Sequence, residues 1–333
     1  MTTALPLAPR LGVHLPHKGR LVPAASRAIE IGAQVVQVFA DNPTAWRRRV
    51  QPPKQLPVFR ERLASHGVAP LAIHASYLIN LASPDETFWQ RSVATLAAEL
   101  RAAAVFGARL VNVHIGSHRG SGTQAGLARI GLAVRRALEE AGRDGTGEPM
   151  AAPLLVLEDS AGGGDGMGGP LEELAAVLDA CAAAGADTRR VAFCLDTAHL
   201  WGAGHAIDTA EGVAVTLETF GRLVGSERLA MVHLNDSKAA LGSHLDRHEH
   251  IGAGHIGPAG LGALLRHPAL AGLPVILETP RMDEGFDAHN LARARLLLAG
   301  AQELPPLPEE AAPAAPRQRS RTTRKCPPPP STA

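Results

Sequence analysis

Eight short apolar runs recur along the chain, and their spacing constrains the fold more than any other feature. They are rich in β-branched residues and begin at Leu11, Val35, Leu71, Leu110, Leu154, Val191, Leu229 and Pro274. Most of the segments between them, such as residues 126–142 and 170–186, have the apolar period of a helix. A strand followed by a helix, repeated eight times, predicts an α/β protein built as one (β/α)8 barrel. A doubly wound open sheet is the structural alternative, although eight parallel strands in an open sheet are less common at this length.

The composition excludes several classes of protein. The chain has 333 residues, is 45% hydrophobic and carries a net charge of +1, so it can bury a large core and lacks the global basic field of a protein that coats nucleic acid. Its three cysteines form no CxxC pair, which disfavours a disulfide framework and favours a reducing interior. We find no apolar run long enough to span a membrane and no signal peptide, and therefore expect a cytoplasmic protein without a membrane partner.

The end of the chain differs in composition from the rest. Residues 303–333 are rich in Pro, Ala and Arg and have almost no large apolar side chains. Such a segment cannot bury enough apolar surface to offset its ordering entropy. We therefore predict a barrel domain over residues 1–302 and a disordered tail over 303–333. The tail is either an uncommitted solvated segment or a basic arm with non-specific affinity for phosphate.

Metal-competent side chains stand at the ends of six different apolar runs. They are His74, His114, Glu158, Asp196, His233 and Glu278. In a barrel the carboxyl ends of all strands meet on one face, where the active site lies. Six such residues together are difficult to explain as packing.

Three more residues extend this set. His199 follows Asp196 by three residues, and Asp246 and His248 are two residues apart, so both can point the same way in an extended segment. Imidazole and carboxylate ligands without thiolates suit Zn²⁺, Mn²⁺ or Fe²⁺. Because one metal takes three or four protein ligands, nine ligands fit two or three metals. Clustered divalent metals are suited to phosphoester displacement.

The motifs around these residues resemble the endonuclease IV family of apurinic/apyrimidinic endonucleases. The likeness runs in barrel order from about Leu11 to Leu298 and includes "HASYLINLASP", "VNVHIGSH", "LVLEDSAG", "CLDTAH", "HLNDSK", "DRHEHIG" and "ILETP". The resemblance implies a TIM barrel with three zinc ions that cleaves DNA 5′ to an abasic site and leaves a 3′-hydroxyl and a 5′-deoxyribose phosphate. It also implies cleaning of blocked 3′ ends, a monomer, double-stranded DNA with abasic sites as the partner, and a nucleoid-associated bacterial protein.

The resemblance also assigns the ligands. His74 and His114 would hold the first metal, and Glu158, the residue we name as catalytic, would bridge the first and second. Each of the two other metals takes three further residues. These are Asp196, His233 and Glu278 for the second metal, and His199, Asp246 and His248 for the third. His244, His250 and His255 are left as loop residues or side chains that face the substrate.

The DNA contacts are predicted less directly. Tyr77 and Leu78 match two loop positions that the family inserts at the lesion, with simple packing as the alternative for Tyr77. Arg247 flanks a ligand and would contact phosphate or pair with a neighbouring acid. His14 ends the first run and would contact phosphate or support the metal ligands. Lys238 has the same alternatives as Arg247.

Two positions depart from the family pattern. Thr44 stands where a wedge arginine is usual. Either the wedge is weaker here, or Arg47 to Arg49 substitute by reaching phosphates, with a solvated charged face as the alternative role of these arginines. Asp159 stands where Asn is more common. An added carboxylate there would attract metal but repel phosphate.

Two other functions account for part of the pattern. A sugar isomerase or epimerase of the xylose-isomerase-like barrel group would hold one divalent metal with Glu158, Asp196, His233 and Glu278. The five other candidate ligands would then have no role. A DNA-binding scaffold without turnover is a non-enzymatic alternative, but no ligand position is missing.

Overall fold

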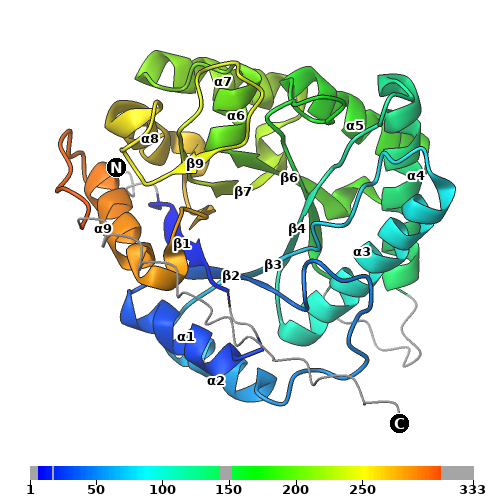
Figure 1. Ribbon diagram of the computed structural model, residues 1–333, viewed down its shortest axis with the longest axis horizontal. Helices are drawn as coiled ribbons and strands as arrows, with labels where there is room; N and C mark the ends of the chain where they lie inside the picture. Colours follow the sequence, from blue (N-terminus) through cyan, green and yellow to red (C-terminus); the bar gives the residue numbers. More distant parts are fainter. Residues whose placement is uncertain (1–6, 17–18, 143–151, 309–333) are drawn as a thin grey trace, which may run out of the picture.

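The computed structural model describes residues 7–16, 19–142 and 152–308. Eight parallel strands form a closed barrel in the order β1-β10-β7-β6-β5-β4-β3-β2 (Figure 1). The strands are β1 (Arg10–His14), β2 (Val35–Phe39), β3 (Leu71–His74), β4 (Leu110–His114), β5 (Leu154–Glu158), β6 (Val191–Asp196), β7 (Leu229–His233) and β10 (Pro274–Leu277). Each coincides with one of the eight apolar runs, so the predicted barrel is confirmed and the open sheet is excluded.

Helices surround the barrel on the outside (Figure 1). They are α1 (Leu21–Glu30), α2 (Leu56–Ser65), α3 (Glu86–Phe106), α4 (Thr123–Ala141), α5 (Leu171–Ala183), α6 (Thr197–Ala203), α7 (Ala210–Leu223), α8 (Gly257–Leu265) and α9 (Phe286–Leu298), with short 3-10 turns at Thr188–Arg190, Ser226–Arg228, Pro268–Leu270 and Met282–Glu284. Two further strands, β8 (Asp236–Ser237) and β9 (His248–Glu249), pair antiparallel after β7. This hairpin, which the apolar runs did not predict, carries His248.

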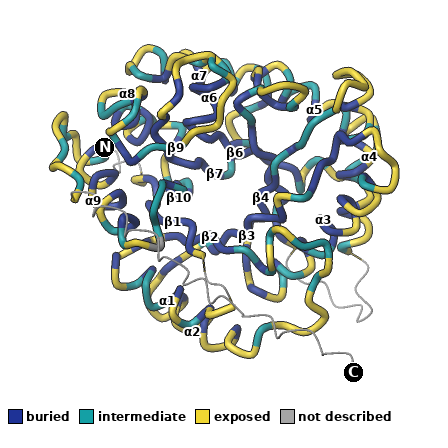
Figure 2. The backbone as a smooth tube through the Cα atoms, in the orientation of Figure 1, coloured by how far each residue is buried: buried dark blue, intermediate teal, exposed yellow. Residues whose placement is uncertain are grey.

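The core is divided between the two sides of the barrel wall. One large cluster packs strand residues such as Val13 and Ile73 against the apolar faces of the helices. In Figure 2 the barrel strands are mostly buried, while the helices around them have buried and exposed parts. A second, smaller cluster draws residues from seven of the eight barrel strands: Val35, Ala72, Leu110, Val156, Cys194, Met231 and Ile276. Because strand side chains alternate, the residues two positions further along point the same way. Those residues are Gln37, His74, Asn112, Glu158, Asp196, His233 and Glu278.

The first residues of the predicted tail, which we began at residue 303, contact the barrel. Leu304 packs against the core, and Arg293 donates a hydrogen bond to the carbonyl of Pro305. Residues 309–333, the greater part of the predicted tail, lie outside the described residues. Among the described residues, no helix is both long and apolar enough to cross a membrane.

Candidate metal centre

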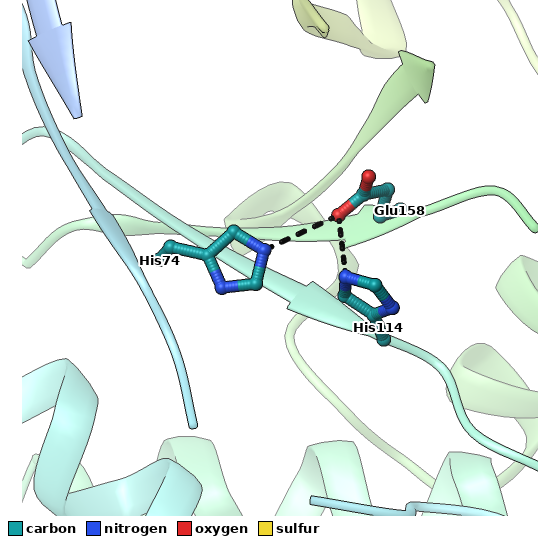
Figure 3. Close-up of side chains that lie close together, drawn as sticks. All are labelled: His74, His114 and Glu158. Atoms are coloured by element: carbon teal, nitrogen blue, oxygen red, sulfur yellow. Dashed lines mark ion pairs between the residues drawn. The ribbon is translucent and has the colours of Figure 1, made fainter. Parts of the chain in front are cut away.

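The first group of side chains comes from three neighbouring strands. His74, His114 and Glu158 end β3, β4 and β5 and offer ligand atoms within 4.8 Å of one another (Figure 3). The Nε2 atoms of His74 and His114 lie 3.7 and 3.4 Å from Glu158 Oε2. His74 Nδ1 lies 2.8 Å from the carbonyl of Ala75 and donates to it. The lone pair on Nε2 is therefore directed at the carboxylate, as a metal ligand requires.

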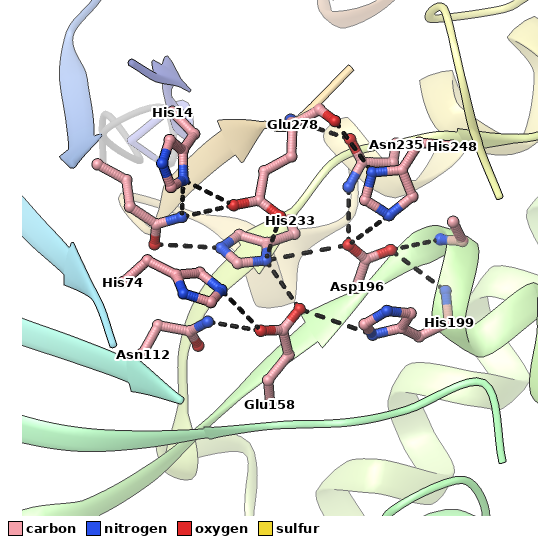
Figure 4. A network of polar contacts seen from close by, with 12 residues as sticks. His14, His74, Asn112, Glu158, Asp196, His199, His233, Asn235, His248 and Glu278 are labelled. Atoms are coloured by element: carbon pink, nitrogen blue, oxygen red, sulfur yellow. Dashed lines mark hydrogen bonds and ion pairs between the residues drawn. The ribbon is translucent and has the colours of Figure 1, made fainter. Parts of the chain in front are cut away.

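The second group surrounds His233 at the end of β7. Its Nδ1 lies 3.0 Å from Glu158, 3.3 Å from Glu278 and 3.9 Å from Asp196 (Figure 4). These four residues form a second set of ligand atoms within 4.8 Å of one another. Glu158 belongs to both the first and second groups, so one carboxylate joins them.

The third group depends on how β6 passes directly into α6. Asp196 ends β6, and its Oδ1 accepts the amides of Ala198 and His199 at 2.7 and 3.2 Å, which caps α6. The first turn of α6 thereby brings His199 back beside Asp196, and both group with His248 of β9. Asp246 is half-exposed, and its carboxylate lies 3.3 Å from His199 Nε2 and 3.0 Å from His248 Nε2. The structure therefore brings all nine predicted ligands to the carboxyl ends of the strands.

Three amides that we did not predict hold this arrangement in place. Gln37 Nε2 donates to Glu278 Oε1 at 2.7 Å, so its Oε1 is left to accept from His233 Nε2 at 3.2 Å. Asn112 donates to Glu158 at 2.6 Å, and Asn235 donates to Asp196 at 2.7 Å. Gln37 and Asn112 are single polar residues inside apolar strands, a signal that the sequence did contain.

The hydrogen bond to Gln37 determines what His233 presents to the carboxylates. When the proton is on Nε2 alone, Nδ1 directs a lone pair at Glu158 and Glu278, where a cation could accept it. Without a cation, burial would lower the pKa of His233, but neighbouring acids, Glu278 and Glu158 among them, raise it well above its ordinary value. Burial would raise the pKa of the Glu158 carboxyl, but His114 and His233 hold that pKa well below its ordinary value. Glu158 is therefore a carboxylate in this setting, which is the protonation state that binds metal.

Unpartnered atoms also fit metal ions. Nδ1 of His199 and Nε2 of His248 are buried and make no well-directed hydrogen bond among the described residues, although carboxylates of Asp159 and Asp246 lie 3.5 and 3.0 Å away. A buried nitrogen whose hydrogen bond is not made costs free energy, and a cation between the nitrogen and the carboxylate would satisfy both. The donor set contains nitrogen and oxygen atoms but no thiolate, which suits Zn²⁺ or Mn²⁺. The residues present therefore fit several divalent ions.

Asp159, the departure from the family pattern, lies behind the ligands. Its Oδ1 accepts the backbone amide of Asp196 at 2.8 Å and lies 3.5 Å from His199 Nδ1. Burial raises its pKa to about 7, although His199 opposes the rise. Asp159 thus braces the end of β6 by a contact that an Asn side-chain oxygen could make equally well.

The predicted DNA contacts are placed unevenly. Tyr77 is 55% exposed, Leu78 is half-buried and Arg247 is exposed at the barrel mouth. His14 is buried, and its Nδ1 lies 2.9 Å from Glu278 Oε1. Of its two predicted roles, the structure favours support of Glu278 over contact with phosphate.

The loop after β2 also differs from our expectation. Of the three arginines that we expected either to reach phosphates or to form a solvated face, Arg48 does neither: it is turned inward, and its Nη1 lies 3.0 Å from the buried Glu99. Arg47 and Arg49 are exposed, although Arg49 also lies 3.4 Å from Asp41. Thr44 donates to Asn42 at 2.9 Å within its own loop.

The remaining histidines of the region have structural contacts or face solvent. His244 Nδ1 lies 3.0 Å from the carbonyl of Ala161, and a Cβ on Gly163 would lie 2.7 Å from the carbonyl oxygen of His244. The glycines after β5 thus permit this close approach. His250 is buried against Asn290, and His255 is exposed.

A closed eight-stranded barrel with clustered imidazoles and carboxylates at its mouth defines a class of metal-binding TIM barrels. Residues 25–302 match the family model described as "Xylose isomerase-like TIM barrel". The chain is 39% identical over 292 residues to the probable endonuclease 4 of Methanoculleus marisnigri, covering 87% of this chain and 99% of that protein. The crystal structure of endonuclease IV from Thermus thermophilus superposes with a TM-score of 0.75 at 37% identity, covering 88% of this chain and 100% of the other.

A more distant structure shares the fold alone. D-psicose 3-epimerase from Clostridium cellulolyticum has a TM-score of 0.58 at 13% identity, covering 87% of this chain and 97% of its own. The closer matches extend over nearly the full length of the proteins compared. The chain therefore belongs to the endonuclease 4 family within the xylose isomerase-like TIM barrels, as its motifs indicated.

Proposed function

We propose that this chain is a zinc-dependent endonuclease of DNA repair that hydrolyses the phosphodiester 5′ to an abasic site through a three-metal centre, and that also cleans blocked 3′ ends. The observation that carries this proposal is the overlap of three ligand groups: Glu158 belongs to the first and second, and Asp196 to the second and third. Overlapping groups suit ions that act together on one phosphate.

The nine residues divide among three ions. His74, His114 and Glu158 would hold the first; Glu158, Asp196, His233 and Glu278 the second; and His199, Asp246 and His248 the third, close to Asp196. When bound, zinc ions would supply a hydroxide nucleophile at neutral pH and positive charge for the phosphate oxygens.

The chain's own residues orient the ligands and the substrate. Gln37 keeps the lone pair of His233 Nδ1 directed at the metal position, and Asn112 keeps Glu158 in place between two groups. Tyr77 and Leu78 follow His74 at the barrel mouth, where they would contact the DNA beside the lesion. Arg247, next to Asp246, would contact phosphate. The chain would act as a monomer, and its location in the bacterial cytoplasm stays a prediction.

The site geometry argues against a sugar isomerase. Such an enzyme would use the group around His233 alone, but His74, His114, His199 and His248 also face carboxylates at 3.0 to 3.7 Å. Two further groups would then have no role.

The test is nicking of a duplex that contains one abasic site, with metal analysis of the same preparation. We expect about three zinc per chain, activity that a chelator removes and zinc restores, and loss of nicking in His114→Ala and Glu158→Ala while both remain folded. Loss of about 10³-fold or more corresponds to several kcal/mol of charge stabilisation. His66→Ala, which alters an exposed histidine after α2, is the matched control.

Other outcomes would contradict the proposal. One metal per chain with ketose–aldose interconversion would support the isomerase. DNA affinity without cutting would support a scaffold. Wild-type nicking by Glu158→Ala would remove the assigned centre.

A further inference from the structure

Glu99 is a buried carboxylate that the metal centre does not use. It lies in the middle of α3, among the buried residues Leu96, Leu100 and Ala103, and its side chain is 2% exposed. Glutamate is almost never fully buried without a partner, because removing its charge from water costs several kcal/mol. Its burial therefore indicates that specific partners stabilise it.

The first partner comes from the loop after β2. Arg48 Nη1 lies 3.0 Å from Glu99 Oε1, and the Arg48 side chain is 13% exposed. The same guanidinium donates to the carbonyl of Asn42 at 3.1 Å and to the carbonyl of Ala45. The guanidinium of Arg48 thus binds two carbonyls of its own loop, and Glu99 pairs with the same guanidinium and so connects the loop to α3.

The second partner comes from the loop after β3. Burial raises the pKa of Glu99, and the nearby backbone N–H of Ser76 is one of the groups that oppose this rise. The hydroxyl of Ser76 donates to the carbonyl of Pro43 at 2.6 Å, and the amide of Tyr77 donates to the same carbonyl at 3.1 Å. The loop of residues 41–50, which Glu99 fastens through Arg48, is thereby joined to the loop that presents Tyr77 and Leu78.

Little else holds the first of these loops. None of residues 41–50 is fully buried. A cavity of about 390 Å³ lies between residues 48–53 and α3, lined by Arg49, Gln51, Arg101 and Val105 among others. Its other contacts outside the loop include a ring contact of Trp46 with Phe88 at 5.1 Å and the two hydrogen bonds that the carbonyl of Pro43 accepts from Ser76 and Tyr77. With so few apolar contacts, the loop should open at low free-energy cost once the tether is lost.

We propose that Glu99 is a positioning residue for DNA recognition, one carboxylate on α3 that holds both loops at the barrel mouth in the arrangement that meets the duplex. The inference rests on the proposed function for its DNA readout, but the tether itself can be tested without DNA. Because ordering the loops in advance reduces the entropy lost on binding, the tether should act on affinity and leave the chemical step unchanged.

The experiment compares wild type, Glu99→Gln, Arg48→Met and the double variant as zinc-loaded full-length proteins. Hydrogen exchange of residues 41–50 and 76–79 reports on the loops, and nicking kinetics on an abasic duplex report on recognition. We expect exchange in both loops to quicken by about tenfold in either single variant. KM should rise about tenfold with kcat within about twofold and zinc content unchanged. The double variant should be no worse than the worse single one, because both remove the same contact.

Glu86→Gln is the matched control, since it alters an exposed carboxylate at the start of the same helix and should leave loops and kinetics as in wild type. Unchanged exchange in both loops would overturn the tether. A fall in kcat accompanied by loss of zinc would also overturn it, because Glu99 would then act through the metal centre. If wild type does not nick at all, the proposed function fails, and quicker exchange in the variants would still support the tether.

Discussion

Gln37 shows how a neutral side chain can control a charged site. Its amide links Glu278 and His233, two ligands that come from neighbouring strands. Groups that orient metal ligands typically change metal affinity by about 10- to 100-fold when they are lost. We expect Gln37→Leu, which has a similar volume, to weaken zinc binding by about that factor while the barrel stays folded. Competition with a fluorescent chelator measures the affinity, and wild-type affinity in the variant would show that the amide does not orient the ligands.

Glu99 also predicts a dependence of stability on pH. Burial raises the pKa of its carboxyl to about 7, with Arg48 and His74 lowering it and Asp41 raising it, whereas the unfolded chain holds Glu near 4.3. Between about pH 4 and 7 the unfolded state releases this proton while the folded state keeps it, so this group makes folding less favourable as pH rises through that window.

The Glu99→Gln variant has no carboxyl group at this position that titrates between about pH 4 and 7. We expect its free energy of unfolding to exceed that of wild type by about 1–3 kcal/mol at pH 8, and the difference to approach zero near pH 4. Urea unfolding at both pH values checks this, with Glu86→Gln as the exposed comparison. A variant less stable than wild type at pH 8 would mean that the ion pair with Arg48 outweighs the cost of burial.

Among the elements, the β8–β9 hairpin depends on one buried carboxylate. Asp236 accepts the amides of Ser237, Gly254 and Ile256 at 2.8, 3.0 and 2.9 Å, and that of Gly257 at 3.2 Å. These bonds join the hairpin to the start of α8. Gly254 must be glycine, because a Cβ there would lie 2.4 Å from the carbonyl oxygen of Ser237.

Loss of this carboxylate should therefore affect one metal more than the others. We expect Asp236→Ala to hold about two zinc ions in place of three, since His248 lies on the hairpin while the first two ligand groups come from the barrel strands. Elemental analysis after gel filtration gives the count. Loss of all three ions would show that the hairpin supports the whole centre, and retention of three would show that it is held without Asp236.

The barrel strands could be predicted from the sequence alone, whereas the buried acids on the helices and loops could not. The period of apolar and polar residues predicted all eight barrel strands and placed His74, His114 and Glu158 at their ends, because strand alternation and strand length are local properties. The roles of Asp236 and Glu99 were not predicted, because their partners are distant in the sequence. Glu99, for example, pairs with Arg48, which lies 51 positions before it. Arg48 was expected at the surface, since its sequence neighbours give no sign of a buried acid on α3.

At the scale of the whole molecule, occupancy of the metal centre affects the stability of the fold. Glu158 and Asp196 are almost fully buried, and Glu278 is 16% exposed, so three carboxylates meet at the barrel mouth. Without cations the neighbouring histidines offset the mutual repulsion of these carboxylates: burial would raise the pKa of Glu278, but His233 and His14 lower it. Ions that bind only the folded state stabilise it further, in proportion to their affinity. Removal of zinc should therefore lower the Tm of the wild type.

Glu278→Gln should lower the stability of both the metal-free and the zinc-bound protein, because it removes a carboxylate that pairs with His233 and His14 and one ligand of the ions. We expect a lower Tm than wild type in excess chelator and a larger fall in saturating zinc, with a change of about 1 kcal/mol shifting Tm by a few degrees. Calorimetry under both conditions gives the four values. A variant with a higher Tm than wild type in excess chelator would indicate that repulsion among the carboxylates outweighs the pairing of Glu278 with the histidines and its hydrogen bond from Gln37.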